Sequence, residues 1–261
     1  MEFSRAVDLA AARGFNGVEI APFTLFGDFS PAALRQGLST ARAGLASSGL
    51  AFAGLHWLFV KPEGLRLLSP DAAGRGRAWA HLDLLLDIAG ELGGGELVFG
   101  SPRQRSTCGA ARQDALLWFA DGLSRAAGRA EKTGSRILLE PLPRAHTDIV
   151  NTYREAADII KEVGKPGLGG MFDFHNTIDE TEPWDVLLDR YWNIIHHVHI
   201  NEMDGSHPAL RGKADFDPAF SLLKRRAFGG WVSLEIFSVP DDPENVLRET
   251  MEFLKYEEAA E

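Results

Sequence analysis

The sequence predicts one α/β domain over residues 1–261, a (β/α)8 barrel of the TIM type that lacks its first strand. Short runs rich in β-branched and aromatic residues alternate with longer segments of helical periodicity, which is the pattern of a parallel sheet. Several of the short runs are apolar until their last residues, as expected of strands covered on both faces. Polar residues gather at the downstream ends of these runs, where a parallel barrel carries its catalytic groups.

Seven strands and several long helices follow from this alternation. The predicted strands are Gly17–Phe23, Ala51–Phe59, Glu96–Gly100, Arg136–Leu142, Leu168–Asn176, Ile194–Asn201 and Gly230–Phe237. Helical periodicity is clearest over Ala78–Leu92, Ala115–Lys132 and Thr152–Val163. The glycines Gly93–Gly95 precede a strand instead of following one, so they predict a turn and not a phosphate-binding loop.

The count of seven strands leaves the barrel one short, because closure ordinarily takes eight. An amphipathic helix carrying Phe3, Val7 and Ala10 on one face comes first, Gly14 ends it, and the run GFNGVEI follows. Two explanations are open: the chain is truncated at its N-terminus, which we favour, or the barrel is open between its first and last strands.

Composition narrows the classes of function. At 261 residues and 45% apolar content the chain can bury a sizeable core, while a net charge of −10 argues against nucleic-acid and anionic membrane partners. The single cysteine, Cys108, excludes an internal disulfide and a thiolate zinc cluster. With no signal peptide or membrane span in view, we expect a cytoplasmic protein with a small polar substrate. Six tryptophans and an open sheet edge are compatible with a homodimer.

Four side chains with metal-binding groups end four successive apolar runs, RILLE, LGGMFD, IIHHVHI and WVSLE: they are Glu140, Asp173, His199 and Glu235. Three carboxylates and one imidazole suit a hard divalent cation such as Mn²⁺ or Mg²⁺. Each residue also has a structural explanation. Glu140 can pair with Arg136 or Arg144, and a strand histidine is often a packed residue. Asp173 is harder to explain that way, because a carboxylate buried among aromatic residues is costly without a cation or hydrogen bonds.

His197 shares a strand face with His199 and lies one layer deeper, so a packing role suits it better. Glu19, His56 and His175 also fall at strand ends and are expected at the mouth of the barrel.

The segments LLEPL, MFDFHNT, HVHINEMDG and GWVSLEIF resemble, in this order and spacing, the sugar phosphate isomerase/epimerase superfamily with a xylose-isomerase-like TIM barrel. GFNGVEI and GLHWLF are similar to its second and third strands. Members include ketose 3-epimerases, hydroxypyruvate isomerase, inosose dehydratase and the endonuclease IV group. The resemblance implies that Glu140, Asp173, His199 and Glu235 bind one Mn²⁺, Mg²⁺ or Co²⁺ ion, with Zn²⁺ as a further option. It also implies that Glu140 and Glu235 act as acid and base through an enediolate.

The resemblance also suggests substrate-binding residues, although the chain departs from the family pattern at two of them. His175 follows Asp173 by two residues, whereas ketose epimerases commonly carry a histidine three residues on. His146 stands where they often have another glutamate, and His56 resembles a substrate-contacting histidine. Arginines in segments after strands can bind a carboxylate or phosphate: Arg103, Arg105, Arg144 and Arg211.

The loop Asn201–Phe216 adds His207 and Asp215 as further ligand candidates. Endonuclease IV enzymes carry a second histidine two residues past the aspartate of this loop, where this chain has Asp217. Together with the acidic charge, this weighs against a DNA-repair enzyme.

The leading hypothesis is therefore a divalent-metal-dependent isomerase or epimerase of keto sugars, aldo sugars or sugar acids. A metal-dependent dehydratase of the inosose or dehydroshikimate type is the alternative among enzymes, because the same enolate can expel a β-hydroxyl group. A non-catalytic sugar-binding barrel is the alternative outside enzymes, since an incomplete barrel can fail to hold its ligands in catalytic geometry.

Overall fold

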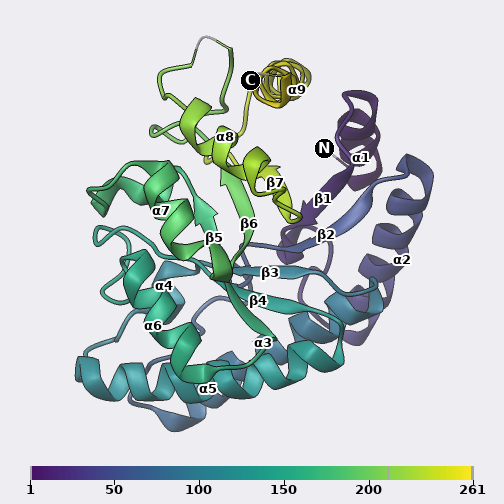
Figure 1. Ribbon diagram of the computed structural model, residues 1–261. Helices are drawn as coiled ribbons and strands as arrows, with labels where there is room; N and C mark the ends of the chain where they lie inside the picture. Colours follow the sequence, from purple (N-terminus) through teal and green to yellow (C-terminus); the bar gives the residue numbers. More distant parts are fainter. Residues whose placement is uncertain (1, 211, 260–261) are drawn as a thin grey trace.

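The computed structural model describes residues 2–210 and 212–259, and within them seven strands form one parallel sheet in the order of the sequence (Figure 1). Each strand pairs with the next along the chain. The strands are β1 (Gly17–Ile20), β2 (Ala51–Leu55), β3 (Glu96–Phe99), β4 (Arg136–Leu139), β5 (Leu168–Asp173), β6 (Ile195–Ile200) and β7 (Trp231–Leu234). This confirms a parallel TIM-type barrel with seven strands in the described part of the chain.

Helices alternate with the strands and surround the sheet. They are α1 (Phe3–Ala12), α2 (Pro31–Ser48), α3 (Ala72–Glu91), α4 (Pro102–Arg105), α5 (Arg112–Lys132), α6 (Tyr153–Val163), α7 (Trp184–Tyr191), α8 (Asp217–Arg225) and α9 (Pro243–Ala259), with 3₁₀ turns at Pro22–Thr24, His175–Asp179 and Trp192–Ile194. Side-chain caps fix several of their starts. Asp71 accepts hydrogen bonds from the backbone amides of Ala73 and Gly74, so α3 begins six residues before the predicted Ala78.

Most predicted strands are too long at their downstream ends. The first was expected to reach Phe23, but β1 stops at Ile20 because Pro22 has no amide hydrogen for the ladder and begins a 3₁₀ turn. The second was expected to reach Phe59, yet β2 stops at Leu55. The residues beyond these ends lie in the loops above the sheet and not in its ladders.

The sheet is open between its first and last strands, since no ladder joins β1 to β7 among the described residues. The two edges still meet through a side chain. A Cβ atom at Gly17 of β1 would lie 2.5 Å from the Cζ3 atom of Trp231 in β7, so the indole packs directly against the backbone where only glycine leaves room. Outside the sheet, α1 lies beside α9, and Arg13 pairs with Glu244 across 3.1 Å.

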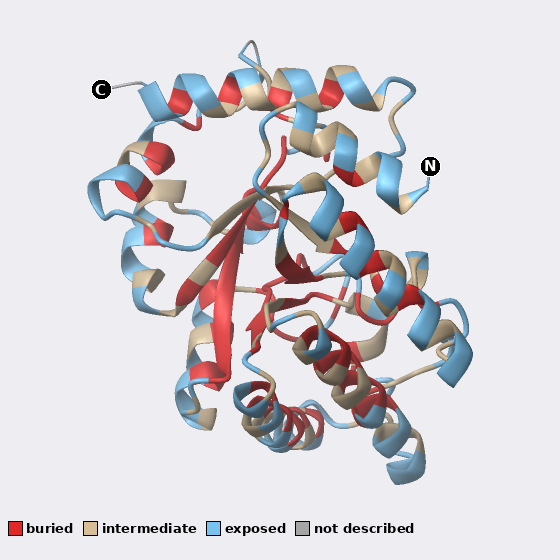
Figure 2. Ribbon diagram, turned by 90° about the vertical axis from the view of Figure 1, so that its right-hand side faces the viewer, coloured by how far each residue is buried: buried red, intermediate tan, exposed pale blue. Residues whose placement is uncertain are grey.

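Burial follows the same geometry. Figure 2 shows buried residues along the central strands and on the inward faces of the helices. All six residues of β5 are buried, whereas the four residues of β7, at the open edge, are only half-buried. The core is therefore well formed beneath β2 to β6, and the opening leaves the two outer strands less covered.

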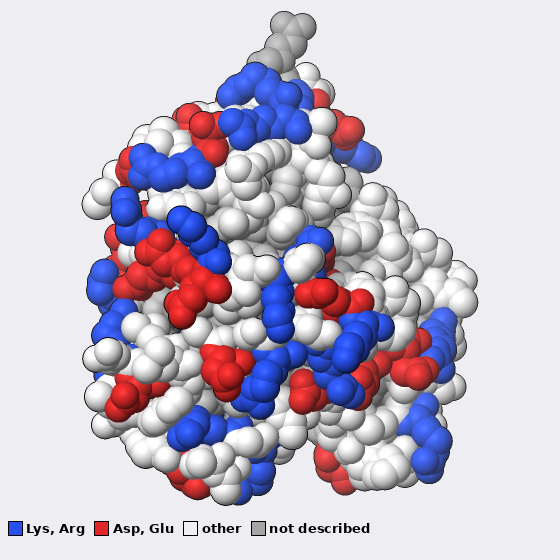
Figure 3. All heavy atoms as spheres, turned by 60° about the horizontal axis from the view of Figure 1, so that its bottom comes forward, with Lys and Arg blue, Asp and Glu red and all other residues white. Residues whose placement is uncertain are grey.

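The surface carries both signs of charge. On the face in Figure 3, basic and acidic side chains are interspersed. Among the helices of residues 2–210 and 212–259, none combines the length and apolar character that crossing a membrane requires.

Candidate metal centre

The structure brings the four predicted ligands together at the carboxyl ends of the last four strands. Glu140 follows β4, Asp173 ends β5, His199 lies in β6 and Glu235 follows β7. All four are buried, and one ligand atom from each lies within 4.8 Å of the others. Regular strand ends thus converge on a volume suited to one ion.

The contacts within this cluster indicate that its residues fit a cation. His199 Nδ1 lies 2.9 Å from Glu235 Oε2 and 3.7 Å from Asp173 Oδ2. Asp173 is fully buried, and its Oδ2 atom has no hydrogen-bond donor among the described residues. A buried carboxylate oxygen without a donor is costly, and three such carboxylates repel one another. A divalent ion would remove both penalties.

Burial raises the pKa of Glu140 well above its usual value, and the nearby carboxylates of Asp173 and Glu235 raise it further. Burial also raises the pKa of Asp173, although contact with His199 opposes that rise. At Glu235, burial acts in the same direction, but the field and hydrogen bond of His199 outweigh it and hold the pKa of Glu235 well below its usual value. The cluster therefore has an excess of acidic groups for its single imidazole.

A ring of donors holds the carboxylates in place. Asn176 Nδ2 donates a 2.9 Å hydrogen bond to Glu140 Oε1, and the indole nitrogen of Trp57 donates a 2.9 Å hydrogen bond to Glu235 Oε1. The guanidinium of Arg105 is fully buried and donates to backbone carbonyls of Phe99, Glu140 and Val150 at 3.1, 2.6 and 3.2 Å. Such outer contacts orient metal ligands and are part of a working site.

The cluster forms the floor of a cavity of about 1010 Å³. Glu140 and Glu235 reach the cavity surface, while Asp173 and His199 are fully buried beneath it. This volume lies at the upper end of the range for pockets that bind small molecules. A substrate can therefore reach the two glutamates from solvent.

The three predicted substrate-binding histidines all line this cavity. His56 Nδ1 lies 3.4 Å from Glu235 Oε1. His175 packs its ring against Phe237 with a centroid distance of 4.8 Å, and its Nδ1 atom is buried without a hydrogen-bond partner among the described residues. His146 is exposed at the rim. His56 thus lies against the floor of the cavity.

The four arginines predicted to bind an anionic group differ in their positions. Arg211 lies outside the described residues. Arg103 lines the cavity, whereas Arg144 is exposed and is not among the lining residues. Arg105 is not available to a substrate, because its guanidinium is buried and donates hydrogen bonds to three backbone carbonyls. The expectation that it approaches the mouth of the barrel was wrong. Arg105 is the last residue of α4, and its side chain lies in the interior.

The two extra ligand candidates do not join the cluster. His207 Nε2 lies 2.8 Å from Glu249 Oε2, on the outer side of the fold beside α9. Asp215 lines a separate shallow hollow with residues of α7 and α8. Of the alternative partners considered for Glu140, Arg136 pairs instead with Glu96 across 3.4 Å, and Arg144 is exposed.

Sequence reasoning missed Trp57 and Asn176. Asn176 had a local signal: its backbone amide donates to Asp173 Oδ1 at 3.2 Å, three residues away, in the turn that follows β5. Trp57 had none, because it meets Glu235 across 178 residues of chain. The position of Asn176 is set by a local turn, whereas the contact of Trp57 with Glu235 depends on how the whole sheet curves.

Comparison with known proteins finds sugar epimerases among the relatives of this chain. A ketose 3-epimerase from Arthrobacter globiformis is 27% identical over 230 residues, which cover 85% of this chain and 74% of that protein. A 3-dehydro-D-guloside 4-epimerase from Escherichia coli K12 is 29% identical over 127 residues, and the chain spans about half of its length. These relatives indicate an enzyme of the epimerase/isomerase class, as the sequence predicts.

Solved structures show the same fold. A 3-keto-D-glucoside 4-epimerase from E. coli superposes with a TM-score of 0.81 at 20% identity, covering 98% of this chain and 94% of that one. A D-allulose 3-epimerase from Methylomonas sp., solved with D-allulose, gives 0.79 at 21% identity, covering 98% and 91%. The family model described as xylose isomerase-like TIM barrel matches residues 7–257. On this match, with the seven-stranded parallel barrel and the ligands at its strand ends, the chain belongs to the xylose isomerase-like TIM barrel family.

Proposed function

We propose that this protein is a divalent-metal-dependent sugar isomerase or epimerase in which Glu140 and Glu235 move a proton at the carbon beside a carbonyl. The observation that supports this most strongly is the buried four-ligand cluster, with the donorless Asp173 Oδ2, at the floor of a solvent-accessible cavity. The names of the curated relatives support the same chemistry.

Glu140, Asp173, His199 and Glu235 would hold the ion. When bound, such an ion polarises a substrate carbonyl and stabilises the negative charge that develops on its oxygen. Three oxygen donors favour Mn²⁺ or Mg²⁺, and the imidazole makes Co²⁺ and Zn²⁺ acceptable as well.

Residues at the cavity surface would carry out the proton transfers and bind the substrate. Glu140 and Glu235 both line the cavity, so one removes a proton from the substrate carbon and the other returns one. Return to the opposite face of the same carbon gives an epimer, and return to the neighbouring carbon gives an aldose–ketose pair. His175 Nδ1, buried and without a partner among the described residues, is free to hydrogen-bond a substrate oxygen.

Two arginines favour a sugar acid among the substrates considered. Arg66 and Arg103 line the cavity on adjacent loops, which are joined by a 2.7 Å hydrogen bond from Leu67 N to Gln104 O. Arg66 donates only to the neighbouring carbonyl of Leu65, and Arg103 has no hydrogen-bond or ion-pair partner among the described residues.

The other acidic residues above the cluster are already paired, Glu63 with Lys61 and Asp204 with Lys213. The two guanidinium groups therefore carry uncompensated positive charge, which suits a carboxylate on the substrate. A cytoplasmic location and a homodimer remain predictions from the sequence.

A substrate screen in D₂O tests the proposal. Mn²⁺-loaded protein is incubated with keto sugars, aldo sugars and sugar acids, and the products are followed by NMR. We expect deuterium at the carbon beside the carbonyl together with an epimer or isomer. Loss of water from the substrate would identify the dehydratase alternative. Metal-loaded protein that exchanges no proton in any of these compounds would overturn the assignment.

A further inference from the structure

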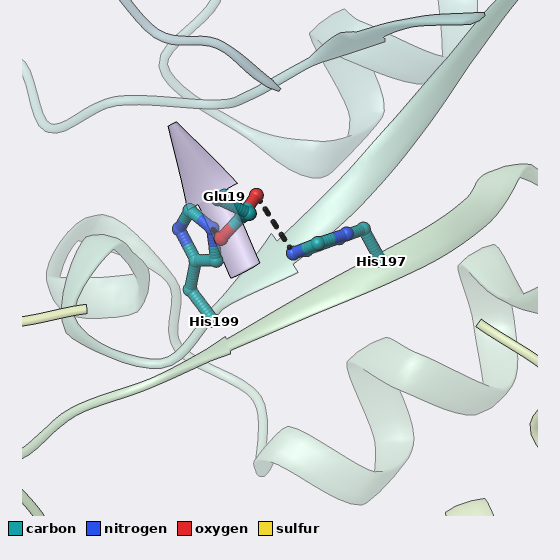
Figure 4. Close-up of side chains that lie close together, drawn as sticks. All are labelled: Glu19, His197 and His199. Carbon is teal, nitrogen blue, oxygen red and sulfur yellow. Dashed lines mark hydrogen bonds and ion pairs between the residues drawn. The ribbon is translucent and has the colours of Figure 1, made fainter. Parts of the chain in front are cut away.

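A second group of ionisable residues lies directly beneath the metal cluster and has no role in the function proposed above. Glu19 of β1 places its carboxylate between two histidines of β6 (Figure 4). Its Oε2 atom lies 3.0 Å from His199 Nε2, and its Oε1 atom lies 3.2 Å from His197 Nε2. The side chain of Glu19 is 7% exposed and those of both histidines are fully buried.

These contacts cross the interior of the barrel, because β1 and β6 are not neighbours in the sheet. Glu19 and His199 are 180 residues apart in the chain. The carboxylate therefore reaches the underside of a metal ligand from the first strand, across the open side of the barrel.

The two ring nitrogens of His199 face different surroundings. Nδ1 faces the cluster, 2.9 Å from Glu235 Oε2, while Nε2 faces Glu19. A neutral imidazole carries a hydrogen on one nitrogen and a lone pair on the other, and an ionised carboxylate only accepts hydrogen bonds. Both nitrogens thus face a carboxylate, but only Nδ1 faces the place of the ion. An ion bound in the cluster takes the Nδ1 lone pair, and the carboxylate of Glu19 then holds the one remaining hydrogen on Nε2.

We propose that Glu19 is a positioning residue, which fixes the tautomer and ring orientation of His199 so that Nδ1 faces the metal ion, and that His197 holds the second oxygen of Glu19. This inference rests on the metal site of the proposed function. Metal-binding histidines commonly have a carboxylate on their other nitrogen, and its loss typically weakens metal binding by about 10- to 100-fold.

A second metal ion is the competing explanation, since Glu19, His197 and His199 are also close enough to share one. Two observations favour the positioning role. Glu19 Oε2 lies at hydrogen-bond distance from His199 Nε2, on the side of the ring away from the four-ligand cluster, and none of the three residues lines the cavity through which a further ligand or water would come. Counting the bound ions separates the two explanations.

The test combines a metal titration with the tautomer of His199. Metal-free wild-type protein and the Glu19→Gln variant are titrated with Mn²⁺ by calorimetry. ¹⁵N NMR of the same proteins loaded with diamagnetic Zn²⁺ reports which ring nitrogen of His199 binds the ion and which carries hydrogen. Glu257→Gln is the matched control, because Glu257 is also buried but lies on α9.

We expect one Mn²⁺ per chain in all three proteins, with about 10- to 100-fold weaker binding in Glu19→Gln alone. The wild-type His199 should carry its hydrogen on Nε2, and the variant should lose this preference. His197→Asn, which keeps Glu19 but removes its second contact, should weaken binding less than Glu19→Gln.

Three results would overturn the inference: Nε2 and not Nδ1 of His199 bound to Zn²⁺ in the wild type, unchanged Mn²⁺ affinity in Glu19→Gln, or a second bound ion that this variant loses. The nitrogen of His199 that binds the ion is read in the wild-type protein, so this result tests the role of Glu19 even if Glu19→Gln does not fold. A wild-type protein that binds no Mn²⁺ would instead refute the proposed function.

Discussion

The indole of Trp57, just beyond β2, donates a 2.9 Å hydrogen bond to Glu235, just beyond β7, and so holds a proposed metal ligand across the open side of the barrel. Glu235 follows the last strand of the sheet, and β7 forms no ladder with β1 among the described residues. It is nevertheless buried, since Trp57 and His199 contact its two oxygens. A side chain from a loop thus takes over part of the support that a neighbouring strand would give.

Replacing Trp57 with phenylalanine should therefore weaken metal binding. The ring remains but the donor is lost, and a hydrogen bond to a charged group contributes about 1.5–3 kcal/mol. We expect Mn²⁺ affinity in a calorimetric titration to fall by roughly 10-fold or more. Trp118→Phe is the control, because Trp118 lies on α5, where it packs under Arg75. Equal affinity in Trp57→Phe and wild type would show that the indole does not support Glu235.

Replacing Arg105 with methionine should destabilise the fold strongly. Methionine fills part of the space but leaves three buried carbonyls, those of Phe99, Glu140 and Val150, without their donor. We expect the free energy of unfolding in urea to fall by about 3 kcal/mol or more. Arg103→Met, two residues away at an exposed position, should change it by less than about 0.5 kcal/mol. A loss of similar size in both variants would contradict this role for Arg105.

Arg66→Gln and Arg103→Gln should discriminate between charged and neutral substrates. Each change removes one of the two uncompensated charges of the cavity, so KM for a sugar acid should rise by about 5- to 10-fold. KM for the corresponding neutral sugar and kcat for both should stay near their wild-type values. Steady-state kinetics on a matched pair of substrates measures this, and equal effects on both members would argue against a carboxylate subsite.

Glu257 should make the protein less stable as pH rises. Burial raises the pKa of Glu257 from 4.5 to about 7, and the carboxylates of Asp217 and Asp215 add to this. Between these two pH values the folded state holds a proton that the unfolded state has released, so stability present below about pH 4.5 is lost as pH rises through about 7.

Glu257→Gln should remove this dependence and stabilise the protein at pH 8 by about 1 kcal/mol, a modest gain because solvent partly screens the charge. Urea unfolding at pH 5 and pH 8 measures the difference. The exposed Glu252→Gln serves as control. A Glu257→Gln variant that gains no stability at pH 8 relative to pH 5 would show that Glu257 does not carry the proton.

Sequence reasoning succeeded where the periodicity of a strand decides the outcome. Asp173 ends a run of six buried residues, so its place at the carboxyl edge followed from the pattern, and the same holds for Glu140. Sequence reasoning failed where the position of a side chain depends on the geometry of a turn or on the curvature of the sheet. Arg105 was expected to be able to bind a carboxylate or phosphate at the barrel mouth, but α4, which begins after the left-handed backbone of Ser101 with φ of 50°, places it in the interior.

The contacts of Glu19 and Trp57 could not be predicted from the sequence for a related reason. Glu19 meets His199 across 180 residues of chain, and Trp57 meets Glu235 across 178. These distances depend on how far an incomplete barrel closes, and no local pattern reports that closure. The ends of individual strands could be placed from the sequence, whereas contacts between strands that are not neighbours in the sheet required the folded structure.

The most direct test of the metal centre is a calorimetric titration of metal-free wild-type protein and Asp173→Asn with Mn²⁺. We predict one ion per chain in the wild type and binding weakened at least about 100-fold in the variant, because its buried carboxylate ligand is gone. The metal-free variant should be at least as stable as the wild type, since Asp173 Oδ2 has no donor there among the described residues. Wild-type protein that binds no Mn²⁺, or an Asp173→Asn variant that binds it as tightly, would contradict the account.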